Sequence, residues 1–194
     1  MKKERAFSLV CQMTIMGIGI SLFGWIFEVA GRWAIYGVLE DRGFITLPLC
    51  PIYGVTLISV YLLFGTPSHP SLWLSRLTEK AHFTIRLAVY FLFVCLLASA
   101  IELVTAFAFA PFGVRLWTYA EQPLNLFGAI CLGYSVLWGA LITAFMWLGW
   151  ERIFSLLARI PKRLSISLAI SLGTIVAVDF FINCAILVSE SLKI

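Results

Sequence analysis

Three acidic residues stand inside long apolar stretches of this sequence, where a charge is costly. They are Glu28, Glu102 and Asp179. At the centre of a membrane-spanning helix a carboxylate costs about 2.5 to 3.5 kcal/mol on insertion scales, so it normally faces the protein interior or a water-filled cavity. We therefore take these residues as the first candidates for a functional site. The alternative for each is an ion pair or hydrogen bond that only fixes helix packing.

Two of the three carboxylates have a polar residue one helical turn further on. Arg32 follows Glu28 by four residues on the same helical face, a spacing that permits an ion pair. Asn183 stands in the same relation to Asp179, so the last apolar stretch carries a polar stripe.

Glu102 has no basic residue after it in its own apolar stretch, so its partner must come from elsewhere. Arg42 and Arg115, in the loops after the first and third apolar stretches, are candidate ion-pair partners or anion ligands. The alternative is that they are solvated loop arginines. The predicted polar cluster comprises seven residues on the outer side of the bilayer: Glu28, Arg32, Arg42, Glu102, Arg115, Asn125 and Asp179.

Familiar catalytic and metal-binding motifs are missing from the sequence. It has no HExxH, GxSxG, Walker or CxxC motif, and His69 and His82 stand thirteen residues apart without a ligand pattern between them. We therefore predict no catalytic residue, no metal ligand and no cofactor, and take the five separated cysteines as small core residues.

The composition is that of a membrane protein. Of the 194 residues, 61% are hydrophobic and 12% are charged, whereas charged residues make up about a quarter of a typical soluble domain. The net charge of +4 comes from short basic clusters between apolar runs. That distribution indicates membrane topology and a lipid bilayer as partner, and it argues against nucleic acid.

Five apolar segments are long enough, or nearly so, to cross about 30 Å of hydrocarbon. The sequence therefore predicts an all-α, polytopic membrane protein with five transmembrane helices in one domain, residues 1–194. The second segment is the shortest and follows Pro48 and Pro51, so it is a candidate for a partly re-entrant helix. The predicted spans are 7–30, 47–64, 87–110, 126–148 and 164–188.

Basic residues are distributed unequally between the two sides of these spans. Ten fall on the side of the N-terminus and four on the other. The positive-inside rule then places the N-terminus in the cytoplasm and the C-terminus outside. The ten are Lys2, Lys3, Arg5, Arg76, Lys80, Arg86, Arg152, Arg159, Lys162 and Arg163, and the four are Arg32, Arg42, Arg115 and Lys193.

The first four spans contain a possible internal repeat. An offset of 74 residues places Glu28 on Glu102 and, without a gap, Tyr53-Gly54 on Phe127-Gly128. Both halves would begin on the cytoplasmic side, which predicts a parallel two-helix repeat about an axis along the membrane normal. Chance agreement in a sequence of biased composition is the alternative.

Several short motifs resemble one bacterial membrane family. They are Glu28, Asp41-Arg42-Gly43-Phe44, Pro48, Pro51-Ile52-Tyr53-Gly54, Glu102, Trp117-Thr118-Tyr119, Asn125-Leu126-Phe127-Gly128, Cys131 and Trp138. Together they resemble the family called putative ABC-transporter type IV, or CmpB-like putative ABC transporter permeases, over about residues 20–145. The resemblance implies a multi-pass protein of the bacterial plasma membrane and, because the chain lacks an ATP-binding motif, a separate ATPase subunit. It provides no catalytic residue.

Transport is the leading functional hypothesis from the sequence. In it the carboxylates and loop arginines line an outward-facing polar cavity of a permease or transport-related subunit. One alternative is a membrane-embedded enzyme acting on lipid headgroups, with an arginine binding phosphate and a carboxylate acting as general base. The other is a non-catalytic assembly or regulatory protein. An oligomer is compatible with each of the three.

Overall fold

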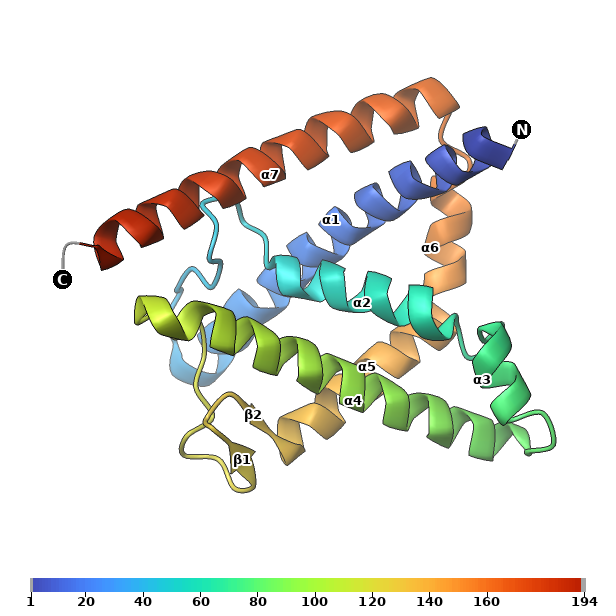
Figure 1. Ribbon diagram of the computed structural model, residues 1–194, viewed down its shortest axis with the longest axis horizontal. Coiled ribbons are helices and arrows are strands. Elements are labelled where there is room, and N and C mark those ends of the chain that lie inside the picture. The colour runs from blue at the N-terminus through green and yellow to red at the C-terminus, as the bar shows by residue number, and fades with distance from the viewer. Residues whose placement is uncertain (1, 193–194) are drawn as a thin grey trace. The chain divides into compact units, whose positions relative to one another are not determined.

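The computed structural model describes residues 2–192, and 73% of the chain is helical. This confirms the all-α class predicted from the sequence. The only strands among the described residues are two strands of two residues each, which form a hairpin (Figure 1). In chain order the elements are α1 (Lys2–Tyr36), α2 (Pro51–Phe64), α3 (Leu72–Leu77), α4 (Phe83–Phe109), η1 (Ala110–Phe112), β1 (Asn125–Leu126), β2 (Ile130–Cys131), α5 (Leu132–Leu148), α6 (Trp150–Leu157) and α7 (Lys162–Ser191).

Three described helices are long and apolar enough to cross a membrane, in keeping with a membrane-embedded protein. They cover Ala6–Tyr36, Phe83–Phe112 and Lys162–Ser191. A fourth span is obtained if α5 and α6, which meet at a bend of 51°, are counted as one.

The predicted boundaries of the second and fourth spans need correction. Helix α2 begins at Pro51, four residues later than predicted, and has 14 residues, or about 21 Å at 1.5 Å per residue. That is shorter than the hydrocarbon core. Helix α5 begins at Leu132 and not at residue 126, because residues 125–131 form the hairpin. The count of five spans therefore stays a prediction.

The chain divides into two compact units. Unit 1 comprises Met1–Val55 with Phe154–Ile194, and unit 2 comprises Thr56–Ile153. The single-domain organisation stays a prediction.

In unit 1, helices α1 and α7 lie side by side and run in the same direction (Figure 1). Gly173 of α7 faces Thr14 of α1, since a Cβ at Gly173 would lie 3.5 Å from Thr14 Cγ2. The start of α2 crosses α1 even more closely. A Cβ at Gly54 would lie 2.3 Å from the carbonyl oxygen of Gly17 and 2.5 Å from Ser21 Oγ. Small residues thus set the helix approach in this unit, as is typical of membrane helices.

In unit 2, helices α4 and α5 pack against each other and run in opposite directions (Figure 1). Gly139 of α5 lies against Cys95 of α4, and Ser99 Oγ donates to Ser135 Oγ at 2.7 Å. The end of α5 meets the start of α4, where the rings of Phe83 and Trp147 lie 5.7 Å apart.

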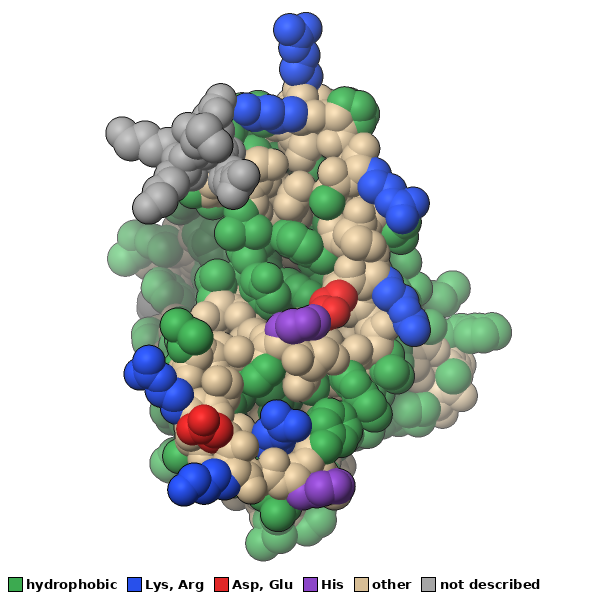
Figure 2. Space-filling view, turned by 90° about the vertical axis from the view of Figure 1, so that its right-hand side faces the viewer, with side chains coloured by type: hydrophobic (Ala, Val, Ile, Leu, Met, Phe, Trp, Pro, Cys, Tyr) green, Lys and Arg blue, Asp and Glu red, His purple; other side chains and the backbone are tan. Residues whose placement is uncertain are grey.

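The end of unit 2 at the start of α4 carries most of its basic residues. Arg76 and Lys80 precede α4, Arg86 stands in its first turn, and Arg152 follows the bend after α5. At the other end of the two helices stands Arg115. In Figure 2 Lys, Arg and His side chains are seen singly among hydrophobic ones.

The two motifs aligned by the predicted repeat differ in local structure. Tyr53 and Gly54 lie in the first turn of α2. Phe127 and Gly128 instead form the turn of the hairpin, with φ values of 58° and 66°. The repeat of the helices themselves stays a prediction.

Candidate functional site

Glu28, near the end of α1, is the centre of a polar network in unit 1. Its Oε1 accepts a hydrogen bond from the Tyr53 hydroxyl at 2.7 Å, and its Oε2 accepts one from Arg42 Nε at 3.3 Å. The ion pair is half-buried, with side-chain exposures of 23% for Arg42 and 28% for Glu28. A carboxylate on an apolar helix is therefore neutralised by an arginine of the following loop.

A glycine one turn before Glu28 positions Tyr53. A Cβ at Gly24 would lie 2.4 Å from the Tyr53 ring, so the ring occupies the space that any other side chain would fill. The Tyr53 ring lies against α1 at this point, and its hydroxyl reaches Glu28.

Arg32 takes a different partner from the one that its helical spacing permits. It forms a short ion pair with Glu40, and its guanidinium lies 5.0 Å from the centre of the Tyr36 ring. Glu28 pairs with Arg42 because the loop of residues 37–50 folds back along the end of α1. This returns both Glu40 and Arg42 to the helix.

Asp41 holds the same loop to α1 from another side. Its Oδ1 accepts hydrogen bonds from Trp25 Nε1 at 2.7 Å and from the Gly43 backbone N–H at 3.1 Å. These donors, the Trp25 indole first, lower the pKa of the Asp41 carboxyl below its ordinary value of 3.8, because they stabilise the charged form.

The lowered pKa of Asp41 predicts a pH dependence of stability. A depressed carboxyl pKa stabilises the folded state above the ordinary pKa, and this contribution is lost as the pH falls through the folded-state value. Between pH 6 and about pH 3, we expect the unfolding temperature of the native protein to fall more steeply than that of Asp41→Asn. Thermal unfolding of both proteins in the same detergent measures this difference. Parallel curves would contradict it.

Asp179 and Asn183 fasten the loop to α7. Asp179 Oδ2 accepts a hydrogen bond from the Leu47 backbone N–H at 3.0 Å, and Asn183 Nδ2 donates to Asp179 Oδ1 and to Thr46 Oγ1, each at 3.2 Å. The rings of Phe44 and Phe180 meet edge to face at 5.8 Å. The polar stripe predicted on this helix thus binds backbone and side chain of the 37–50 loop.

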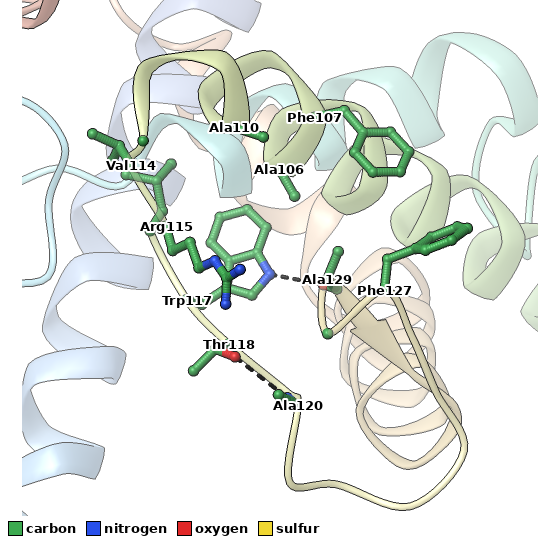
Figure 3. A pocket seen from close by; sticks show the side chains of 13 residues that line it. Ala106, Phe107, Ala110, Val114, Arg115, Trp117, Thr118, Ala120, Phe127 and Ala129 are labelled. Atoms are coloured by element: carbon green, nitrogen blue, oxygen red, sulfur yellow. Dashed lines mark hydrogen bonds between the residues drawn. The ribbon is translucent and has the colours of Figure 1, made fainter. Parts of the chain in front are cut away.

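The remaining three predicted residues lie in unit 2 and have separate environments. Glu102 is half-buried on α4. Asn125 fixes the hairpin: its Nδ2 donates to the carbonyls of Ala120 and Gln122 at 3.3 and 2.8 Å, and its Oδ1 accepts from Gly128 N–H at 3.1 Å. Within residues 2–192 the Arg115 guanidinium has no ion pair or hydrogen bond, and it lines a cavity beside the hairpin (Figure 3).

The structure therefore brings Glu28 and Arg42 together in one network of unit 1, and it places Asp179 on the same loop. Arg32 stands beside this network with its own partner. Because Glu102, Arg115 and Asn125 belong to the other unit, a single cluster of all seven residues stays a prediction.

Some polar partners were missed by the sequence reasoning. In unit 1 these are Glu40, Asp41 and Tyr53; Asp41 and Tyr53 belong to the family motifs, but none of the three was expected as a partner of the predicted cluster. Residue spacing along one helix cannot reveal them, because Glu40 and Asp41 come from the loop and Tyr53 comes from α2.

A second missed group lies in unit 2, at the basic end. Glu151 Oε1 lies 2.6 Å from His69 Nδ1 and accepts from Thr66 Oγ1 at 2.8 Å, while the His69 backbone N–H donates to Thr66 Oγ1 at 3.0 Å. The carboxylate joins the turn after α2 to the start of α6. In the sequence, the signal available for this group was Glu151, a lone acidic residue directly before Arg152.

Comparison with known proteins gives one match. Residues 16–184 match the family model described as putative ABC-transporter type IV. The comparisons with curated proteins and with solved structures gave no match. The matched region includes the whole of the 37–50 loop, its contacts on α1 and α7, and the hairpin.

Proposed function

The chain belongs to the putative ABC-transporter type IV family, and from this premise we propose that it is a transport-related membrane subunit in which the Glu28 network faces an aqueous path. The matched region covers both helices and the loop that carry this network. In this function the residues of the Glu28 network line the path of the transported solute.

The observation that carries the proposal is the state of the Glu28–Arg42 pair. At 3.3 Å the pair makes one long contact, and both side chains keep about a quarter of their surface exposed. A fully buried ion pair would resist opening, because separating it leaves uncompensated charge in a medium of low dielectric. A partly hydrated pair can exchange its partners with water or with a polar solute. It therefore suits a path through apolar helices.

The orientation that we propose places the N-terminus in the cytoplasm, the C-terminus outside, and the network toward the outer side. Support comes from the four basic residues at one end of unit 2 against Arg115 at the other. In unit 1 the parallel helices α1 and α7 both begin with basic residues, Lys2, Lys3 and Arg5 in one and Lys162 and Arg163 in the other. We retain five spans and the parallel two-helix repeat as parts of this proposal, in the bacterial plasma membrane.

The energy source would be a separate ATPase subunit. The sequence has no nucleotide-binding motif, so a transporter built on this chain would need a partner to bind ATP. The basic end of unit 2, on the proposed cytoplasmic side, is where such a partner would have access.

A second candidate function is a non-catalytic assembly subunit, and one observation favours it. Asp179 and Asn183 hold the 37–50 loop on α7, and Asp41 of the loop accepts a hydrogen bond from Trp25 of α1. In this alternative the network stabilises the loop and no aqueous path exists.

Thiol labelling separates the two functions. In a variant whose five native cysteines are replaced by alanine, Tyr53→Cys places a thiol beside Glu28. We expect a small, membrane-impermeant thiosulfonate to label it from both membrane faces, because a transport path must open to each side. Labelling is measured by mass spectrometry on right-side-out and inside-out vesicles. A thiol that reacts from one face only, or from neither, would support the assembly role.

Two further variants serve as controls and test the orientation. Thr46 and Lys80 are both exposed. Thr46→Cys should react only from outside and Lys80→Cys only from the cytoplasmic face. The reverse pattern would overturn the proposed orientation, and each variant is first checked for a monodisperse elution profile in detergent.

A further inference from the structure

Unit 2 contains a cavity of about 470 Å³ at the end opposite its basic cluster. The cavity is half-open, and it is lined by the last turn of α4, the η1 turn, the loop of residues 113–120 and the turn of the hairpin (Figure 3). A volume of this size is within the range of small-molecule sites, about 300 to 1,000 Å³. None of the contacts that form the Glu28 network involves these residues.

Hydrogen bonds hold the walls of the cavity in place. Trp117 Nε1 donates to the Ala129 carbonyl at 2.8 Å, and the Tyr119 backbone N–H donates to the Gly128 carbonyl at 2.8 Å. These bonds tie the 113–120 loop to the hairpin. The rings of Phe107 and Phe127, 5.6 Å apart, join the hairpin to α4.

The hairpin also holds two non-glycine residues in the left-handed region. Leu124 and Phe127 have φ values of 55° and 58°. This conformation costs about 1 kcal/mol or more for a residue with a Cβ, and such residues cluster at ligand sites. Both side chains are large and exposed, Leu124 to 75% and Phe127 to 74%.

The charge of the cavity comes from one arginine. Arg115 is the only ionisable residue among those described that line it. Figure 3 shows the side chains of Arg115 and Trp117 extending from the loop into the cavity. The guanidinium has five donors in a planar fork that matches a phosphate or carboxylate, and no protein partner within residues 2–192 occupies them.

The surroundings of the cavity select the kind of anion. A free inorganic anion would find a single positive charge among mainly apolar walls, and exposed Leu124 and Phe127 would gain nothing from it. An anion that carries acyl chains would bind Arg115 through its headgroup and place its chains along these exposed side chains. Apolar area removed from water stabilises such a complex by about 25 cal/mol per Å².

We propose that this cavity binds the phosphate of an anionic phospholipid, with Arg115 as the headgroup ligand and with Leu124 and Phe127 against the acyl chains. The aromatic and arginine residues then stand at the level of the headgroups, where amphipathic rings are favoured. The site is a binding site, and the proposal includes no covalent step. It does not rest on the transport function.

Native mass spectrometry of the full chain in detergent, titrated with phosphatidylglycerol, tests the proposal. We expect one tightly retained lipid, and we expect Arg115→Gln to weaken its binding about tenfold, as for loss of a charge-assisted hydrogen-bond partner. The lipid affinity of Arg115→Lys should lie between those of the native protein and of Arg115→Gln, because an ammonium lacks the bidentate fork. Arg86→Gln removes the same charge at the other end of α4 and should leave this lipid in place.

Separate arms of the experiment distinguish the source of the phosphate and locate the site. Phosphatidylglycerol, but not inorganic phosphate, should slow amide hydrogen exchange in residues 113–131, and phosphatidylcholine with the same chains should act more weakly. Equal protection by inorganic phosphate would overturn the lipid assignment. Two results would overturn the site. One is an equal loss of lipid affinity in Arg115→Gln and Arg86→Gln, and the other is amide hydrogen exchange in residues 113–131 that the lipid does not change.

Discussion

Replacing Gly54 by alanine is expected to lower the free energy of unfolding by about 3 kcal/mol, the upper part of the range for overpacked sites. The added Cβ would lie 2.3 Å from the Gly17 carbonyl oxygen and 2.5 Å from Ser21 Oγ. The nearer obstacle is backbone and cannot rotate away. The start of α2 would have to move from α1, and the Tyr53 ring, which lies on Gly24, would move with it.

Gly19→Ala provides a matched control on α1. Apart from the adjoining backbone of α1, no described atom lies within 4 Å of a Cβ at Gly19, two residues from Gly17. Because glycine inside a helix is less favourable than alanine by about 1 kcal/mol, this change should be neutral or stabilising. Unfolding midpoints of both variants in mixed detergent micelles measure the difference. If Gly54→Ala unfolds at the midpoint of Gly19→Ala, the close crossing of α1 and α2 is wrong.

The helix-packing surfaces could be anticipated in part from the sequence. Gly24 and Gly139 are small residues of the kind that permits close helix approach, and the structure places Tyr53 and Cys95 against them. Their contacts could not be assigned, because a small residue shows where a helix can be approached but not by which side chain. Gly54 packs against Gly17, whereas in the sequence Gly54 stood out only through the repeat and the family motif.

The polar residues of unit 1 show a second limit. For Glu28, helical periodicity favoured Arg32 at a spacing of four, while Arg42 was one of two loop arginines without a fixed distance. The loop decided between them, since Glu40 pairs with Arg32 and leaves Arg42 for Glu28. A choice of this kind depends on backbone conformation over residues 37–50 and cannot be obtained from residue spacing.

The hairpin was predicted as the start of a span, because residues 124–132 are mostly apolar. Hydropathy does not detect that Asn125 bonds three backbone groups of this turn. Left-handed φ values at Leu124 and Phe127 run against the preference of both residue types. The hydrogen bonds of the hairpin therefore override the local backbone preference of these two residues. The cavity beside Arg115 depends on the hairpin that results.

Glu28→Gln is expected to lower the free energy of unfolding by about 2 kcal/mol, less than the about 3 to 5 kcal/mol typical of a fully buried pair, because this pair is partly hydrated. A glutamine oxygen can still accept the hydrogen bond from Tyr53, so the measured loss reports mainly on Arg42. The Arg42 guanidinium would be left half-buried without a counter-charge.

A double-mutant cycle isolates the pair. Arg42→Gln should lower the free energy of unfolding about as much as Glu28→Gln. The loss in the double variant should be smaller than the sum of the two single losses by about 1 to 2 kcal/mol. The same cycle on Arg32 and Glu40, whose side chains are 39% and 47% exposed, should show a coupling of about 1 kcal/mol or less. Additive losses at Glu28 and Arg42 would mean that the ion pair contributes no coupling. In that case the network of Glu28 would be reduced to its hydrogen bond with Tyr53, and the aqueous path proposed around an exchangeable pair would lose its basis.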